Sequence, residues 1–361
     1  MSKDTHKKIA LVTISLAGGG AERSTAMLSQ MLSKNGCDVH LITLTDAIDY
    51  EYSGTLFNLG KYKTVSDSLV KRLRRFTKLK EYLSQEKFDF ILDARNRKNK
   101  YKEWYYLNYL YKNERVIYIT HSYKLDSYFP ASSLISQKMI DRSIGVVGVS
   151  QAITDRINST FKTDKAETIY NAIPPLPVVS NDQDSSYFIF AGRLVDEVKN
   201  VSLLIDAFAK AYSQNSDCKL KICGDGPDKK MLEQKVSDLG LQTVVDFEVF
   251  DPTIFSKMAQ ARALILTSHY EGFPMVVVEA LGVGTPVISV DCKSGPNEVI
   301  KNKENGLLVE NYNVEVLASA IHTFTIDDTL YERCKLNAKE SVSHLSMEEI
   351  GKTWTHYLNS L

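Results

Sequence analysis

The sequence contains no run of about 18 consecutive apolar residues, so we expect no segment that crosses a membrane. Its five cysteines are odd in number and share no paired spacing, which argues against a disulfide framework and a zinc site. The first residues lead directly into a β-like run and lack the pattern of a secretory signal. No internal repeat and no low-complexity tract is visible. These absences predict a reduced, cytoplasmic protein.

The formal net charge is zero, but the charges are divided unequally along the 361 residues. Residues 1–175 hold 27 Lys and Arg against 18 Asp and Glu, whereas residues 176–361 hold 17 against 26. A chain of this length is typical of two domains. We therefore expect a basic first domain that faces an anionic surface or acceptor, beside an acidic second domain.

Much of the basic excess lies in two segments, 71–80 and 95–102. Around the first, apolar residues recur at helical spacing at positions 69, 73, 76, 79 and 83. Aromatic residues follow the second at positions 104–106. A basic amphipathic helix with aromatic neighbours is typical of a bilayer interface. An ordinary surface helix, docked by its leucines with a solvated basic face, is an equal alternative.

Apolar runs alternate with helical patterns in both halves of the chain. Strands are predicted at 9–16, 38–45, 88–93, 115–120, 144–149, 187–191, 219–223, 244–249, 263–267 and 286–290. Helices are predicted at 21–35, 203–213, 229–239, 254–261, 274–282 and 347–361. Alternation of this kind predicts parallel, doubly wound sheets with sites at the carboxyl ends of the strands. A Pro-rich and then polar stretch at 172–186 reads as a linker between domains.

The most informative segment carries two glutamates, Glu271 and Glu279, eight positions apart. Gly272 and Pro274 keep Glu271 outside a helix, and Pro274 favours the start of one. Glu279 lies about one turn inside that helix, where it could reach ribose hydroxyls while Glu271 projects toward a sugar. A buried helix with two incidental glutamates is the alternative.

The start of this helix is a candidate diphosphate site. The first main-chain N–H groups of a helix have no partner within it, and they carry partial positive charge. The groups expected to bind an anion here are the N–H groups of Met275, Val276 and Val277.

At these residues the chain resembles the retaining glycosyltransferases of family 4, whose hallmark is a Glu-x7-Glu motif in the second half of a GT-B fold. The resemblance covers nearly the whole chain, because further family landmarks follow in the expected order. They are Gly18-Gly-Gly-Ala-Glu-Arg23, Thr120-His-Ser122, Val149-Ser150, Tyr170-Asn171, Ala191-Gly-Arg-Leu194, Lys199-Asn200, Gly224-Asp-Gly-Pro227 and Gly295-Pro-Asn-Glu298.

The resemblance implies an α/β protein of the GT-B fold, with two Rossmann-like, doubly wound parallel-sheet domains facing across a cleft. Residues 1–171 would form the acceptor-side domain, 172–186 the linker and 187–343 the nucleotide-sugar-binding domain. Residues 344–361 would return as a helix to pack on the first domain.

The resemblance also implies the roles of individual residues. Arg193 and Lys199 match the family's Arg and Lys, which stabilise the departing diphosphate without a metal, although a surface ion-pair role is an alternative. His121 matches a position that contacts the donor sugar, with a structural histidine as competitor. The implied catalytic residues are Arg193, Lys199, Glu271 and His121. The implied donor-binding residues are Gly19, Gly20, Gly192, Gly224, Phe250, Gly272, Phe273, Pro274, Met275, Val276 and Glu279.

Two other ligand classes fit the sequence less well. The glycine-rich segment 18–23 lets the backbone approach a phosphate or sugar, but Arg23 stands where a Gly-x-Gly-x-x-Gly dinucleotide motif needs glycine. A purely structural glycine turn remains an alternative. The only Asp-x-Asp motif, Asp182-Gln-Asp184, lies in the expected linker, so we expect no metal cofactor.

The chain departs from the family pattern at two places. Val249 stands before Phe250 where family members usually carry glycine in the base-binding turn, which weakens the assignment of base contacts. Gly295-Pro-Asn-Glu298 replaces the commoner Gly-Gly-x-x-Glu and resembles members that move N-acetylhexosamines or galactose onto lipid-linked glycans.

The sequence thus predicts a metal-independent retaining glycosyltransferase that moves a hexose or N-acetylhexosamine from a UDP-sugar to a glycan. The acceptor is expected to be lipid-linked, in the synthesis of cell-surface polysaccharide such as lipopolysaccharide or capsule. A peripheral contact with an anionic membrane at its inner face is a further hypothesis, and no nucleic acid is expected as partner. A GT-B sugar-nucleotide epimerase or hydrolase and a non-catalytic glycan-binding subunit are the alternative functions.

Overall fold

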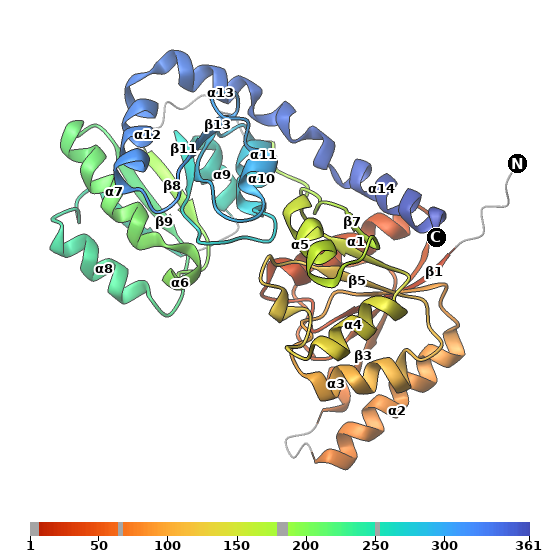
Figure 1. Cartoon of the computed structure of the whole chain (residues 1–361). Coiled ribbons are helices and arrows are strands. Elements are labelled where there is room, and N and C mark those ends of the chain that lie inside the picture. Colours follow the sequence, from red (N-terminus) through yellow and green to blue (C-terminus); the bar gives the residue numbers. More distant parts are fainter. Residues whose placement is uncertain (1–6, 64–67, 179–186, 250–252) are drawn as a thin grey trace, which may run out of the picture. The chain divides into compact units, whose positions relative to one another are not determined.

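The computed structural model describes residues 7–63, 68–178, 187–249 and 253–361, which form two compact α/β units (Figure 1). The first unit runs to Ala172 and also includes Met347–Leu361. The second unit is Ile173–Ser346. The first unit is therefore built from two separate stretches of chain, with the second unit inserted between them.

The first unit contains a seven-stranded parallel sheet in the order β3-β2-β1-β4-β5-β6-β7. Its strands are β1 (Lys8–Thr13), β2 (Asp38–Thr43), β3 (Thr55–Asn58), β4 (Phe90–Asp93), β5 (Val116–Thr120), β6 (Gly145–Gly148) and β7 (Ala166–Thr168). Central strands such as β1 and β4 are buried on both faces, which explains their nearly continuous apolar sequences. The order of strands reverses between β1 and β4, so a crevice is expected at their carboxyl ends.

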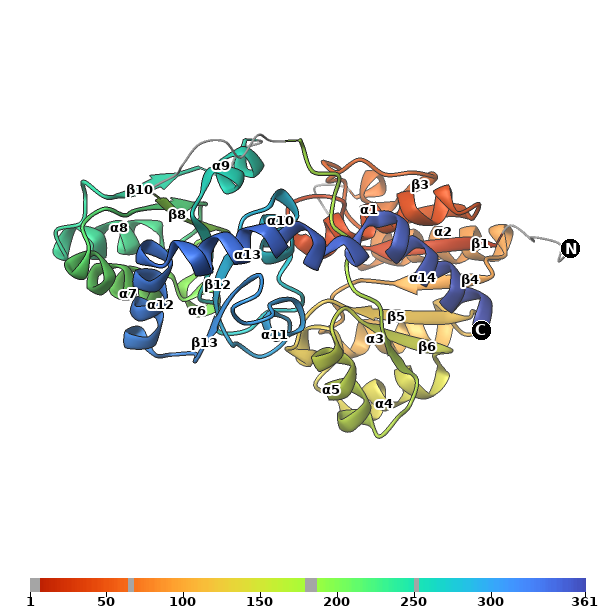
Figure 2. The same ribbon diagram turned by 90° about the horizontal axis from the view of Figure 1, so that it is seen from above.

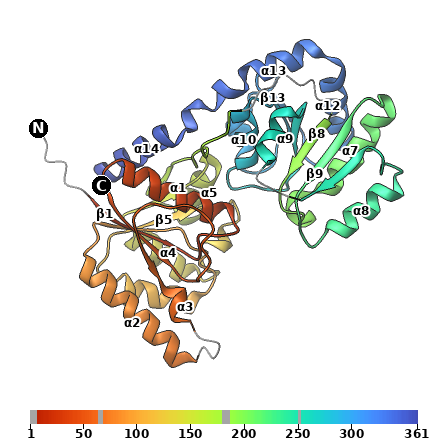
Figure 3. The same ribbon diagram turned by 180° about the vertical axis from the view of Figure 1, so that it is seen from behind.

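The helices of the first unit connect these strands. They are α1 (Gly20–Lys34), α2 (Leu69–Glu86), α3 (Lys100–Tyr105), α4 (Ser133–Arg142), α5 (Gln151–Phe161) and α14 (Met347–Ser360), with short turns η1 (Leu59–Tyr62) and η3 (Leu125–Ser127) and a π-helical turn η2 (Tyr106–Leu110). The terminal helix α14 packs on α1 (Figures 1 and 3). Trp354 and Tyr357 of α14 are each 4% exposed, so the helix is part of the core of this unit.

The second unit contains a six-stranded parallel sheet in the order β10-β9-β8-β11-β12-β13. Its strands are β8 (Tyr187–Ala191), β9 (Lys219–Cys223), β10 (Val245–Glu248), β11 (Ala263–Leu266), β12 (Val287–Val290) and β13 (Gly306–Val309). Its helices are α6 (Asp196–Lys199), α7 (Val201–Gln214), α8 (Lys229–Asp238), α9 (Ile254–Gln260), α10 (Met275–Val283), α11 (Pro296–Val299), α12 (Val314–Ile326) and α13 (Asp328–Ser341), followed by the turn η4 (Ser343–Leu345).

Helices pack on one another around this second sheet. α7 lies between α8 and α12, and α10 packs against α9 and α13 (Figures 1 and 2). α6 and α7 are separated only by Asn200, whose φ of 49° places it in the left-handed region that asparagine tolerates. This single residue ends α6 directly after Lys199. The order of strands reverses between β8 and β11.

The predicted strands and helices are present, with bounds that differ by at most three residues from those expected. Sequence analysis missed the strands β3, β7 and β13, which have only three or four residues. Runs of that length carry little periodicity. The helices that were also not predicted are α3, α4, α5, α6, α11, α12 and α13.

Candidate active site

The loops after β8 and β11 lie side by side at the carboxyl edge of the second sheet, because the strand order reverses between these two strands. The loop after β8 carries Arg193 and leads into α6, which ends at Lys199. The loop after β11 carries Glu271 and leads into α10. The reversal thereby brings together residues that lie far apart in the sequence.

The Lys199 ammonium and the Glu271 carboxylate form an ion pair, with 2.7 Å between Nζ and Oε1, although the residues are 72 positions apart. The Ser268 hydroxyl donates a second hydrogen bond of 2.6 Å to the same carboxylate oxygen. The side chains of Lys199 and Glu271 are 21% and 13% exposed, so the pair is partly shielded from water. Two of the predicted catalytic residues are thus in direct contact.

The main chain around this pair is fixed from both sides. The Thr267 hydroxyl donates to the carbonyl oxygen of Lys199 at 2.9 Å, and the His269 N–H donates to the carbonyl of Val198 at 2.9 Å. Two hydrogen bonds therefore hold the loop after β11 against α6. No sequence pattern pointed to Ser268 or Thr267, because their contacts form across the strand reversal.

Gly192 lies next to Lys199, and Arg193 follows it in the chain. A Cβ added at Gly192 would lie 3.8 Å from Cε of Lys199, and the adjacent Arg193 side chain is exposed. A Cβ at Gly224 would lie only 1.9 Å from the carbonyl oxygen of Gly192, so the loops after β8 and β9 touch through their backbones. Close packing therefore accounts for glycine at position 224, whether or not a donor binds there.

A third loop, after β12, supports the loop that holds Glu271. The Ser294 hydroxyl donates to the carbonyl of Gly272 at 2.8 Å, and a Cβ at Gly295 would lie 2.4 Å from Cδ of Pro274. Gly295 has a φ of 103°, which glycine adopts without strain. The glycine of the Gly-Pro-Asn-Glu298 motif is thus required by this contact and this backbone conformation.

The start of α10 corrects one expectation. The Met275 N–H donates to the carbonyl of Phe273 at 2.8 Å, and the Val277 N–H donates to that of Pro274 at 2.9 Å. Two of the three N–H groups expected to be available for an anion are thus engaged in a tightened first turn. Glu279, one turn further, is 5% exposed.

Cys292 lies beside the ion pair, which the sequence did not indicate. Burial raises the pKa of its thiol to about 12, and the negative charge of Glu271 acts in the same direction. The thiol is therefore protonated at neutral pH and presents a weakly polar surface to the pair. Phe250 lies outside the described residues, and the neighbouring Val249 is 61% exposed.

In the first unit, the glycine-rich turn after β1 leads into α1. Gly18 has a φ of 77°, and Gly19 is the N-cap of α1. A Cβ added at Gly20 would meet nothing within 4 Å, and Gly20 has no left-handed φ. Neither packing nor backbone conformation therefore requires glycine at position 20, and the space beside it is open.

His121 follows β5 at the carboxyl edge of the same sheet. Both ring nitrogens are buried, and neither has a hydrogen-bond partner within the described part of the chain. Burial lowers the pKa of the imidazole to about 4, and the positive charge of Arg97 acts in the same direction. The ring is neutral at physiological pH. It lines a small cavity of about 10 Å³ together with Asn171 and Trp354, close to the space that one water molecule needs.

The basic segment 95–102 does not have the exposed character that its composition suggested. Arg95 and Arg97 are 0% and 1% exposed. Arg95 forms hydrogen bonds to both carboxylate oxygens of Asp93 and to Glu103, which are themselves buried. Burial alone would raise the pKa of the Asp93 carboxyl, but the two guanidinium groups lower it. The composition of the segment does not tell which of its basic residues are buried, so it could not distinguish these arginines from the exposed lysines that follow.

α2 is docked by its leucines, as one of the two alternatives left open by its sequence requires. Leu79 and Leu83 are 0% and 1% exposed and anchor its second half in the core. Phe76 contacts the rings of Tyr105 and Tyr106, whereas Leu73 is 55% exposed. Large aromatic side chains are exposed close by on α3 and η2, namely Tyr101, Trp104 and Tyr109. The helix is thus docked by its leucines and leaves an apolar and basic surface beside exposed aromatics.

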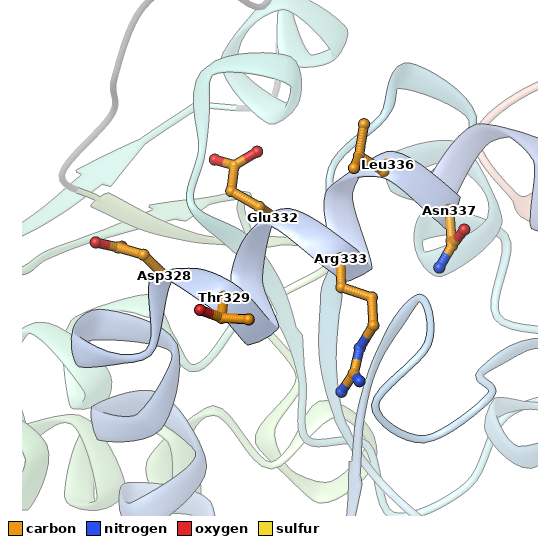
Figure 4. A pocket seen from close by; sticks show the side chains of 6 residues that line it. All are labelled: Asp328, Thr329, Glu332, Arg333, Leu336 and Asn337. Carbon is orange, nitrogen blue, oxygen red and sulfur yellow. The ribbon is translucent and has the colours of Figure 1, made fainter.

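A separate hollow of about 560 Å³ lies along α13 (Figure 4). Six residues of this one helix line it, and they are Asp328, Thr329, Glu332, Arg333, Leu336 and Asn337. No other element contributes a side chain to it, so it lacks the converging groups of a binding site.

No group of three or more His, Cys, Asp or Glu side chains in the described part of the chain is placed to hold a metal ion. None of the helices within it is long and apolar enough to span a bilayer.

Two family models match consecutive parts of the chain. Residues 18–175 match the family described as Glycosyltransferase Family 4, and residues 177–341 match Glycosyl transferases group 1.

Two of the relatives that match the sequence are bacterial proteins. An N-acetylgalactosamine-N,N'-diacetylbacillosaminyl-diphospho-undecaprenol 4-alpha-N-acetylgalactosaminyltransferase of Campylobacter jejuni is 27% identical, over 98% of this chain and 99% of its own. An exopolysaccharide phosphotransferase of Streptomyces coelicolor is 33% identical over 194 residues, and the match spans only 20% of that protein.

Solved structures resemble the whole chain. TarM matches with a TM-score of 0.81 at 15% identity, over 99% of this chain and 100% of TarM. HepE of Anabaena in complex with UDP and glucose matches with a TM-score of 0.80 at 20% identity, over 99% and 100%. The predicted fold class, a GT-B fold with two Rossmann-like parallel-sheet domains, is confirmed.

Proposed function

Because the chain belongs to the glycosyltransferases, with a family 4 domain followed by a group 1 domain, we propose that it moves a hexose or N-acetylhexosamine from a UDP-sugar to a glycan acceptor. The reaction retains the anomeric configuration, needs no metal and serves the synthesis of cell-surface polysaccharide. The acceptor is a saccharide linked to a lipid diphosphate, and the protein works at the inner face of the membrane.

The observation that carries this proposal is the Lys199–Glu271 ion pair at the strand reversal of the second unit. When a sugar leaves a nucleoside diphosphate, the diphosphate gains about one negative charge. A cation that is already held in place and partly shielded from water stabilises this charge without reorganisation. Lys199 is held in this way by Glu271 and by the fixed main chain of α6. Arg193 supplies a second positive charge beside it.

The remaining roles follow from position. The bond between the anomeric carbon and the diphosphate oxygen breaks, and the acceptor hydroxyl attacks the anomeric carbon from the same face. The departing diphosphate oxygen takes the proton of that hydroxyl. Glu271 contacts the donor sugar and holds Lys199, while Glu279 binds the ribose hydroxyls. Gly20 leaves open space for the donor or acceptor on the first unit, and His121 contacts the sugar.

Comparisons support the choice of donor and acceptor. HepE is similar in fold and binds UDP and glucose in its solved structure. The Campylobacter relative, similar over almost its full length, carries the name of an enzyme that acts on a saccharide joined to diphospho-undecaprenol.

The test is a panel of UDP- and GDP-sugars, assayed for nucleotide release with and without excess EDTA. We expect release from a UDP-sugar in the presence of a lipid-linked acceptor, with the rate unchanged by EDTA. NMR spectroscopy of the product should show the anomeric configuration of the donor. Inversion, or turnover that disappears in EDTA and returns with Mg²⁺, contradicts the proposed mechanism.

The surface of α2 supplies the proposed membrane contact. Lys71, Arg74, Arg75 and Lys78 lie on the same helix as the exposed Leu73. Near an anionic bilayer, each Lys or Arg contributes about 1 kcal/mol of binding free energy. The exposed aromatic residues Tyr101, Trp104 and Tyr109 are of the type that sits at the level of lipid headgroups. Burial lowers the pKa of Lys102 to about 8, so Lys102 adds less charge than its neighbours.

Sedimentation with anionic liposomes tests this contact. We expect binding at low salt that weakens as salt rises, and loss of binding when Arg74, Arg75 and Lys78 are changed to Glu. The matched control changes Lys219 and Lys230, exposed lysines of the second unit, to Glu. The proposed contact is contradicted if the wild-type protein does not bind liposomes at low salt. It is also contradicted if the control variant loses as much binding as the α2 variant.

A further inference from the structure

Arg97 is a fully buried arginine whose hydrogen bonds go mainly to the backbone. Its guanidinium donates to the carbonyl oxygens of Asp93 at 2.7 Å, Tyr128 at 2.8 Å and Ile119 at 3.3 Å. Its own N–H donates to the carbonyl of Ser127 at 3.0 Å. These carbonyls belong to the end of β4, to β5 and to the loop after β5. Arg97 therefore joins two neighbouring strands and one loop at the carboxyl edge of the first sheet.

Neutralising Asp93 does not explain the position of Arg97. Arg95 makes the short contacts with the Asp93 carboxylate, at 2.6 Å and 3.0 Å, and it also reaches Glu103 at 3.1 Å. The contact from Arg97 to that carboxylate is longer, at 3.4 Å. Burying a guanidinium is unfavourable unless its donors are satisfied. The three side-chain hydrogen bonds of Arg97 to carbonyl oxygens hold main-chain segments in place.

The loop that Arg97 holds begins at His121 and ends at Tyr128. The Tyr128 hydroxyl lies near the main chain of His121, which acts to lower the pKa of this phenol, and the rings of the two residues lie 6.3 Å apart between centroids. The rings of Tyr118, Tyr128 and Phe129 surround the guanidinium, with centroids 4.8, 5.4 and 5.7 Å from its carbon. Both ends of the loop are thus tied to Arg97, one directly and one through Tyr128.

We propose that Arg97 is a positioning residue for sugar transfer, which fixes the segment from His121 to Tyr128 so that the His121 imidazole is held at the carboxyl edge of the first sheet. This role rests on the proposed function, because it assigns Arg97 to the same reaction. Arg97 itself touches no substrate. It acts through the placement of His121, whose buried ring nitrogens have no hydrogen-bond partner in the described residues and so depend on the loop for their position.

The substitution Arg97→Lys tests the proposal, because lysine keeps the charge but lacks the fork that spans three carbonyls. Misplacement of a contacting group by about 1 Å costs on the order of 100-fold in rate, so we expect kcat to fall by that order. The dissociation constant of UDP, which binds the second unit, should change less than about twofold. In a His121→Ala background, Arg97→Lys should have little further effect on kcat, because the two changes act on one contact.

Lys165→Met is the matched control. Lys165 also binds three main-chain carbonyls in the same unit, those of Ile140, Asp141 and Ser143 at 3.1, 2.8 and 2.8 Å. It precedes β7 and so lies at the opposite edge of the sheet. We expect this variant to lose stability while keeping the kcat of its folded fraction. An equal loss of kcat in the control, or independent effects of Arg97→Lys and His121→Ala, overturns the proposal.

A measurement without turnover separates this proposal from the proposed function. The ¹⁵N signals of the His121 ring, assigned by their loss in His121→Ala, should shift in Arg97→Lys and stay unchanged in Lys165→Met. If Arg97→Lys does not fold, Tyr128→Phe replaces it, because this change removes only the hydroxyl that reaches His121. Unchanged His121 signals overturn the positioning role, whereas shifted signals without any transferase activity contradict only the proposed function.

Discussion

At the scale of single residues, the second unit holds a positive charge ready before any substrate arrives. Glu271 and the main chain of α6 keep Lys199 in one place, and Ser268 keeps Glu271 in one place. Side-chain entropy is therefore lost on folding and not at the moment of reaction. If the ion pair takes part in the reaction, its loss should lower the rate. If it is only structural, its loss should affect stability alone.

Lys199→Met should lower kcat/KM, because the transition state loses about 3–4 kcal/mol of stabilisation. This is the scale for removing one preorganised donor. The control is Lys221→Met, which breaks another ion pair of the same unit, the 3.0 Å contact with Glu248. Both variants should fold, and steady-state kinetics should show a large loss only for Lys199→Met. Similar losses for the two variants would mean that Lys199 has a structural role alone.

The two glutamates should differ in the step that they affect. Glu279→Gln should weaken both UDP and the UDP-sugar, because its carboxylate is expected to bind ribose. Glu271→Gln should lower kcat, because it disturbs the sugar contact and the partner of Lys199, while UDP affinity changes little. Isothermal titration calorimetry measures both affinities. Equal losses of UDP affinity in the two variants would remove the distinction.

His121 should make stability depend on pH. Its pKa is about 4 in the folded protein and 6.5 in the unfolded chain, so the unfolded state binds the proton first as pH falls. Its contribution is present above pH 6.5 and is lost between pH 6.5 and 4. For a pKa shift of this size, the free energy of unfolding falls by up to about 3 kcal/mol. Urea unfolding at pH 7.5 and 4.5 should show a smaller pH effect in His121→Gln than in the wild type.

At the scale of secondary structure, sequence patterns predicted long, buried elements well and short or tertiary features poorly. The strand β8 and the helix α10 carry apolar runs bounded by clear turn residues, and both were predicted within a residue. β13 and β7 have too few residues for a pattern. The burial of Arg95 and Arg97 could not be predicted from the sequence, because only the fold shows the carboxylates and carbonyls that they meet.

The contact between β6 and α14 offers a test at this scale. A Cβ added at Gly145 would lie 2.1 Å from the Tyr357 hydroxyl oxygen, and the ring of Tyr357 is buried. Gly145→Ala should therefore destabilise the protein by about 1–3 kcal/mol, the usual cost of overpacking. Adding Tyr357→Phe removes the clashing oxygen and should recover part of the loss. Thermal unfolding measures both, and a double variant no more stable than Gly145→Ala would contradict the packing of α14 on this strand.

At the scale of the whole molecule, the chain forms two units with separate cores, and the predicted site residues are divided between these units. The contact of Lys199 with Glu271 lies within the second unit, while His121 and Gly20 lie within the first. The half of the chain that holds each residue could be read from the sequence, but not which of these residues touch. The contacts depend on strand order, and no local pattern encodes that order.

UDP should therefore protect one unit more than the other. A ligand at 100 times its dissociation constant stabilises the state that binds it by about 2.7 kcal/mol. Hydrogen exchange with saturating UDP should slow in the loops after β8 and β11 and at the start of α10. Amides of β2 and α2 in the first unit serve as the internal control and should change little. Protection centred on the first unit would contradict the assignment of the nucleotide to the second.

The return of the terminal helix to the first unit sets a rule for recombination between related chains. A chimaera with a single crossover at the junction of Ala172 and Ile173 would join one parent's first sheet to the other parent's α14. That foreign helix would have to match a close contact, since a Cβ at Gly351 would lie 3.4 Å from Cβ of Met31 on α1. An exchange that keeps α1 and α14 from the same parent needs two crossovers, one at each end of the second unit. The second unit is therefore the segment to exchange when the donor specificity of two related chains is to be swapped.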